Sequence, residues 1–201
     1  MITPLVILIS YLIGAFPSAY LIGRLWGRVD LRQEGDGHIS ATAVYRYLGL
    51  KAFIPVLVLD IGKGVLSVYI ASLFTPSAAV LVVAALAAII GHSWSVFLKF
   101  KGGLGGTVMF GTLVSLALKE VGFGIAVFLI TLLFSRKTSL GTWLLLLTVS
   151  VALFIEHQEL VKVFFPIGII ILQLLKRLQM RITNPASNYK NEALDDLKRV
   201  R

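Results

Sequence analysis

Long apolar stretches are the feature of this 201-residue chain that most limits what it can fold into. Hydrophobic residues make up 57% of the sequence and charged residues only 14%. Soluble domains carry about 25% charged residues, whereas a helix that crosses a bilayer needs roughly 17–25 mainly apolar residues. The sequence therefore predicts an all-α integral membrane protein that crosses the membrane several times. Because the chain has no cysteine, disulfides and thiolate catalysis are excluded.

About seven apolar segments are predicted to be transmembrane helices. They lie near residues 3–23, 53–74, 77–98, 106–118, 121–135, 139–155 and 160–177. Lys119-Glu120 is the only separator between the fourth and the fifth segment, so we expect a helix-turn-helix there, and six or eight spans remain alternatives. Hydrophobicity falls after about residue 178. The sequence therefore predicts a membrane domain over 1–178 and a polar cytoplasmic tail over 179–201.

The distribution of basic residues predicts the orientation of the chain. With seven spans, sixteen of the 19 lysines and arginines fall in the odd-numbered connections and the tail. The opposite side holds only Lys119 and Lys162, and Lys63 lies inside a span. The positive-inside rule then places the N-terminus outside and the C-terminus in the cytoplasm of a multi-pass protein of the cell membrane. Most of these cations are expected to contact anionic lipid headgroups, and no nucleic-acid partner is expected.

Two polar, glycine-bearing segments interrupt the apolar pattern, at residues 35–42 and 99–107. Glycine-rich backbone that exposes N–H groups beside cations commonly holds phosphate. In the first segment, Ser40 or Thr42 is expected to cap a helix that continues through Leu48, and the N-terminus of that helix together with Arg46 suits an anion. In the second segment, four glycines follow Lys101 within five positions, which predicts an anion-binding nest.

Charged and titratable side chains within the first of these segments and inside one span are further candidates for chemistry. Asp36 and His38 form a possible acid–base pair, although Asp36 could instead be a turn residue that points away from any ligand. Asp60 and Lys63 share one face of the second span and can neutralise each other there. This pair is interpreted as structural, with the orientation of an active-site loop as the alternative. The small residues Gly14, Gly62 and Gly64 are interpreted as sites of close helix packing.

Taken together, these motifs resemble the bacterial membrane acyl-phosphate:glycerol-3-phosphate acyltransferases. The similarity runs in order through residues 14–20, 29–32, 60–64, 91–92, 100–103 and 136–140. It implies a seven-helix membrane fold with a cytoplasmic active site. It also implies transfer of a fatty acyl group from acyl phosphate to the 1-hydroxyl of glycerol 3-phosphate, without a metal or an organic cofactor. By this resemblance Arg46 would hold the acceptor phosphate, Gly102 and Gly103 would help to bind the donor, and Ser139 would line the site.

Several positions depart from the family pattern. Asp36 and His38 stand where the family has serine and asparagine, Leu104 stands where it has lysine, and residues 176–190 contain no histidine. An inactive relative that binds lipid or regulates an active paralogue, and an acyltransferase with a different acceptor, therefore remain alternatives to glycerol-3-phosphate acylation. A transporter is disfavoured because the spans contain few polar groups. The candidate catalytic residues are Asp36 and His38, and the candidate binding residues are Arg46, Lys101, Gly102, Gly103, Gly105 and Ser139.

Overall fold

The computed structural model describes residues 2–32 and 39–183, and every regular element in these ranges is a helix. The α-helices are α1 (Ile2–Ala15), α2 (Ser18–Gly27), α3 (Ala41–Leu48), α4 (Leu50–Phe74), α5 (Ala78–Ser93), α6 (Gly106–Ser135), α7 (Thr138–Ile155) and α8 (Leu160–Thr183), and a short 3-10 helix covers Val96–Leu98. The prediction of an all-α fold is confirmed. Helix α8 continues past the predicted boundary at residue 178, and the tail beyond Thr183 lies outside the described residues, so the two-part division of the chain stays a prediction.

Five segments of the described chain are long and apolar enough to cross a membrane. They are Ile2–Gly27, Leu50–Phe74, Ala78–Leu98, Gly106–Ser135 and Thr138–Ile155. Helix α8 has 24 residues, and its basic side chains lie toward both of its ends, as membrane helices favour. The number of crossings and the orientation of the termini stay predictions.

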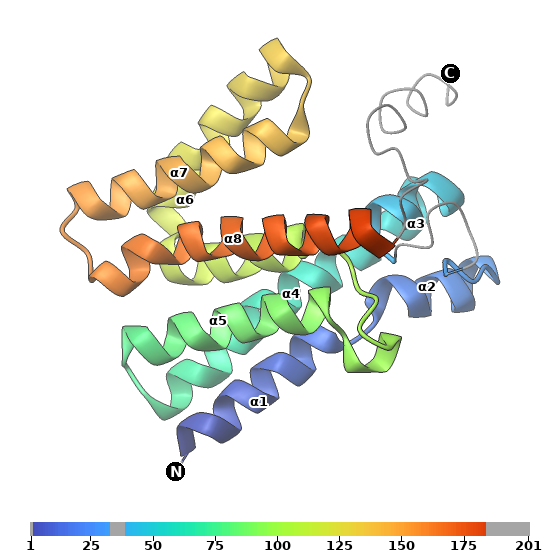
Figure 1. Cartoon of the computed structure of the whole chain (residues 1–201), viewed down its shortest axis with the longest axis horizontal. Coiled ribbons are helices and arrows are strands. Elements are labelled where there is room, and N and C mark those ends of the chain that lie inside the picture. Colours follow the sequence, from blue (N-terminus) through green and yellow to red (C-terminus); the bar gives the residue numbers. More distant parts are fainter. Residues whose placement is uncertain (1, 33–38, 184–201) are drawn as a thin grey trace.

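Two of the long apolar segments, Ile2–Gly27 and Gly106–Ser135, contain a break. The first span divides into α1 and α2 at Phe16-Pro17, because a proline inside a helix removes a backbone hydrogen bond. The fourth and fifth predicted segments form one assigned helix, α6, in which Ala117 has the non-helical angles φ −154° and ψ 50°. Figure 1 shows the chain turning sharply within α6, so that its first half lies along α4 and its second half along α7. The expected helix-turn-helix is present, with its turn at Ala117.

Glycines let the helices cross at close range in two places. A Cβ atom built on Gly64 of α4 would lie 2.3 Å from the carbonyl oxygen of Val108, and one built on Gly111 of α6 would lie 2.1 Å from that of Ile61. Gly14 of α1 and Gly91 of α5 make the same kind of reciprocal approach. The packing interpretation is therefore confirmed for Gly14 and Gly64. It is wrong for Gly62, because a Cβ atom there would meet nothing within 4 Å.

A buried polar network joins three of the helices. The Lys63 ammonium lies 2.7 Å from Asp60 Oδ1 on α4 and donates to Ser18 Oγ, at the start of α2, over 2.8 Å. Ser18 and Thr107 both donate to the Asp60 carboxylate, Thr107 to Oδ2 over 3.0 Å. Asp60 is fully buried and Lys63 is 6% exposed. The pair thus neutralises itself as predicted, and it also holds the first turn of α6 against the break between α1 and α2.

Side-chain bonds to the backbone also fix the segment that follows α5. The Tyr11 hydroxyl donates to the carbonyl oxygen of Trp94 over 2.8 Å, and the Ser95 hydroxyl donates to that of Ala15 over 2.6 Å. In Figure 1 this segment lies at the same end of the molecule as α3 and the last turns of α8, while the N-terminus and the α4–α5 turn lie at the opposite end. The polar segment after α5, helix α3 and the last turns of α8 therefore lie together at one end of the molecule.

Replacement of Gly64 by alanine should destabilise the fold by roughly 1–3 kcal/mol, because the added methyl group would overlap the backbone of α6. Gly62→Ala on the same helix is the matched control, and we expect it to be neutral or slightly stabilising. Thermal unfolding of both variants in detergent measures the difference. Equal unfolding midpoints for the two variants would contradict the close packing of α4 on α6.

Asp60→Asn should destabilise the protein by about 3–5 kcal/mol, because it leaves the Lys63 ammonium buried without its counter-charge. The double variant Asp60→Asn with Lys63→Met removes both charges, and we expect it to recover a large part of the lost stability. Unfolding of the wild type, both single variants and the double variant gives the coupling energy between the two side chains. A coupling energy near zero would show that the pair does not act as a unit.

Candidate active site

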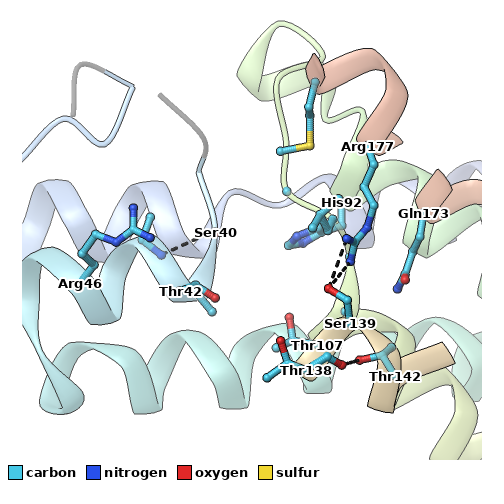
Figure 2. A pocket seen from close by; sticks show the side chains of 17 residues that line it. Ser40, Thr42, Arg46, His92, Thr107, Thr138, Ser139, Thr142, Gln173 and Arg177 are labelled. Atoms are coloured by element: carbon cyan, nitrogen blue, oxygen red, sulfur yellow. Dashed lines mark hydrogen bonds between the residues drawn. The ribbon is translucent and has the colours of Figure 1, made fainter. Parts of the chain in front are cut away.

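A cavity of about 320 Å³ opens where the polar connections gather. Four segments that are distant in sequence form its walls: the start of α3, the glycine segment that leads into α6, the start of α7 and the last turns of α8. His92 of α5 completes the lining. Hydroxyl and amide side chains are frequent on these walls (Figure 2), namely Ser40, Thr42, Thr107, Thr138, Ser139, Thr142 and Gln173.

Three helix N-termini meet at this cavity. Of the two predicted caps, Ser40 and Thr42, it is Ser40 that caps α3, and its Oγ accepts a hydrogen bond from the Ala43 N–H over 3.1 Å. Helices α6 and α7 begin after Gly105 and Lys137, and in the described part of the chain neither has a side-chain cap. The first N–H groups of a helix lack partners within the helix and carry a partial positive charge. Their convergence favours an anionic ligand.

Two arginines add full positive charge to the walls. Arg46 reaches the cavity from α3, and Arg177 reaches it from α8. Arg177 donates to Ser139 Oγ from Nη1 over 3.3 Å and from Nη2 over 3.2 Å, and its guanidinium lies 5.7 Å from the centre of the Trp143 ring. Among the described lining residues no side chain is acidic. The part of the cavity that the structure describes is therefore positively charged.

The glycine segment lies directly against the end of α5. A Cβ atom on Gly102 would lie 1.9 Å from the carbonyl oxygen of His92, and one on Gly103 would lie 2.9 Å from His92 Nε2. Gly105 has φ +74°, in the left-handed region that favours glycine. These glycines let the segment pack tightly on His92, and they leave the N-terminus of α6 facing the cavity.

The candidate site residues differ in where they lie. Arg46, Gly103, Gly105 and Ser139 all line the cavity, although they come from three separate stretches of the sequence. Gly102 is buried and does not line this cavity, and Lys101 is exposed outside the cavity lining. The candidate catalytic residues Asp36 and His38 lie outside the described residues. Leu104, one of the departures from the family pattern, forms part of the cavity wall.

Sequence reasoning missed several residues of the cavity, above all His92, Gln173 and Arg177. His92 Nδ1 lies 3.9 Å from Asp60 Oδ1, so the ring stands between the buried network and the cavity. Gln173 and Arg177 are four residues apart on α8 and share one face of that helix. A glutamine one turn before an arginine, on one face of a long helix, was the available signal. Arg177 is one of the sixteen cations on the predicted cytoplasmic side, most of which were expected to contact lipid headgroups.

Comparisons with known proteins agree with this geometry. Residues 4–184 match the family model of glycerol-3-phosphate acyltransferase. The glycerol-3-phosphate acyltransferase of Carboxydothermus hydrogenoformans is 34% identical over 191 residues, which cover 92% of this chain and 96% of the relative. That of Endomicrobium trichonymphae is 40% identical over 138 residues, which cover 69% of each chain.

Solved structures extend the agreement to three dimensions. The crystal structure of PlsY (YgiH), an integral membrane glycerol 3-phosphate acyltransferase, in its glycerol 3-phosphate form superposes with a TM-score of 0.79 at 30% identity over 91% of this chain and 92% of that one. Its lysophosphatidic acid form gives a TM-score of 0.78 at 27% identity with the same coverage. The fold is that of a multi-pass integral membrane protein, and the chain belongs to the glycerol-3-phosphate acyltransferase family.

Proposed function

We propose that this protein transfers a fatty acyl group from acyl phosphate to the 1-hydroxyl of glycerol 3-phosphate. The acceptor oxygen bonds to the acyl carbon, and the bond from that carbon to the phosphate oxygen breaks. Lysophosphatidic acid and inorganic phosphate are the products, which makes this a step of phospholipid biosynthesis. The observation that carries the proposal is the single cavity at which three helix N-termini and two arginines converge.

This cavity is suited to compounds that carry a terminal phosphate group. Arginine presents a planar fork of donors that matches phosphate, and the exposed N–H groups at the starts of α6 and α7 add further donors. Hydroxyl groups from Thr138, Ser139 and Thr142 lie beside them. Both proposed substrates carry a phosphate group, and both can be held by these donors without a metal or an organic cofactor, although the expectation of no cofactor stays a prediction.

The reaction needs positioning more than it needs a protein nucleophile. Acyl phosphate is a mixed anhydride and is already activated, so direct attack by the hydroxyl becomes fast once the two substrates are held together. The carbonyl oxygen gains negative charge in the transition state, and the N–H groups at Gly105 and Gly106 are available to stabilise it. The hydroxyl proton can pass to the leaving phosphate or to a base. His92, which lines the cavity, is a candidate base beside the predicted pair Asp36 and His38.

The apolar part of the lining gives the acyl chain a route from the bilayer. Leu104 and Met180 line the cavity, and neighbouring residues of α7 and α8, such as Leu140 and Leu178, expose their side chains on the outer surface. A donor bound here can keep its tail among lipids while its phosphate reaches the polar walls. Leu104 also keeps open the alternative of a less anionic acceptor, because leucine offers no charge to a phosphate.

Purified protein in detergent or in lipid nanodiscs should form lysophosphatidic acid from acyl phosphate and glycerol 3-phosphate. Mass spectrometry of the lipid product and colorimetric detection of inorganic phosphate should show the two released in equal amounts. Glycerol in place of glycerol 3-phosphate tests the alternative of an uncharged acceptor. No product above a protein-free blank, under conditions in which a family member with intact motifs is active, would contradict the proposed function.

Arg46→Ala should lower kcat/KM by about 30-fold or more, which corresponds to about 2 kcal/mol for the loss of a charge-assisted phosphate contact. Arg28→Ala is the matched control, since Arg28 is exposed at the end of α2 and does not line the cavity. Initial rates at varied concentrations of each substrate provide the comparison. Similar rates for the two variants would remove Arg46 from the proposed site.

A further inference from the structure

Two positive side chains line one cavity, and the proposed reaction brings two phosphate groups into it. Arg46 belongs to α3, and Arg177 belongs to α8 and stands with the start of α7 (Figure 2). Lys101, the other cation predicted to bind substrate, is exposed outside the cavity lining. Among the described lining residues, Arg46 and Arg177 are therefore the groups that bring a full positive charge to the substrates.

Arg177 is held in a defined position before any ligand binds. Ser139 Oγ accepts from both of its terminal nitrogens, and the Trp143 ring supports the guanidinium at 5.7 Å. An arginine that is already ordered loses little conformational entropy when it binds a ligand. A guanidinium carries five N–H donors, so Nη1 and Nη2 each have a second hydrogen, besides the one directed at Ser139, that can donate to a phosphate oxygen.

The two arginines differ in the large apolar side chains that lie near them. Arg46 shares its wall with Ser40 and Thr42, which are polar residues at the start of α3. Arg177 bonds to the polar Ser139, but it also has Met180 one turn further along α8 and the centre of the Trp143 ring 5.7 Å from its guanidinium. An acyl phosphate joins a dianion to an apolar chain, so it fits a cation that has apolar neighbours. Glycerol 3-phosphate has no acyl chain, and it fits the wall formed by α3, where the described lining residues include no large apolar side chain.

We propose that Arg177 binds the phosphate of the acyl phosphate donor, while Arg46 binds that of glycerol 3-phosphate. This assignment rests on the proposed function. It divides the cavity into a donor side formed by α7 and α8 and an acceptor side formed by α3. Arg177 thereby becomes a substrate-binding residue that also selects the donor.

Steady-state kinetics with Arg177→Gln test this division. The variant should raise KM for acyl phosphate about tenfold or more and change KM for glycerol 3-phosphate less than threefold. Arg46→Lys should show the opposite pattern. Arg181→Gln, one turn further along α8 and exposed outside the cavity lining, is the control and should leave both constants unchanged. Unchanged constants for Arg177→Gln, an effect on the acceptor alone, or equal effects on both substrates would each overturn the division.

Two further measurements test Arg177 when the first variant does not fold or when the wild type forms no product. If Arg177→Gln does not fold, Arg177→Lys is the alternative variant, because lysine keeps the charge but lacks the planar pair of donors. Arg177→Lys should still raise KM for the donor about threefold or more. If the wild type forms no product, the proposed function fails, and thermal-shift titration with inorganic phosphate then tests Arg177 directly. Phosphate binding at least tenfold weaker in Arg177→Gln than in Arg181→Gln supports the assignment, whereas equal binding overturns it.

Discussion

The buried ion pair between Asp60 and Lys63 is the interaction on which the arrangement of the site depends. A charged pair inside a membrane domain is costly unless its charges cancel and its remaining donors and acceptors find partners. Here Ser18 and Thr107 supply those partners, and each belongs to a different helix from the pair. The network therefore holds α4, the start of α2 and the start of α6 in one geometry. Since Thr107 also lines the cavity, the same contacts that neutralise the pair place the N-terminus of α6 at the site.

At the polar end of the molecule, backbone N–H groups contribute to an anion-binding site as much as side chains do. Helices α3, α6 and α7 begin at one cavity, and the glycines before α6 allow that segment to lie directly on His92. Arg46 and Arg177 then add full charges to the partial charges of the helix ends. A reaction between two phosphate compounds needs this combination, because both substrates must be brought together against their mutual repulsion.

Much of the fold could be predicted from local patterns. Apolar run lengths locate the helices, Ser40 caps α3 as expected, and Asp60 and Lys63 share a helical face at their spacing. Arg177 and His92 were missed, because their roles come from contacts with α7, α4 and the glycine segment that no local pattern contains. The break of the first predicted span at Phe16-Pro17 shows a related limit, since a proline alone does not give the direction of the helix that follows it. Gly62 looked equivalent to Gly64, yet only Gly64 faces a neighbouring helix.

The central claim is that this cavity holds the phosphate of glycerol 3-phosphate during acyl transfer. A crystal structure of the protein grown in a lipid mesophase with glycerol 3-phosphate tests the claim most directly. We expect phosphate density inside the cavity, in contact with Arg46 and the start of α3 and within reach of the N-terminus of α6. Ordered glycerol 3-phosphate bound outside the cavity, or a cavity filled only by lipid while the same sample turns over substrate, would contradict it.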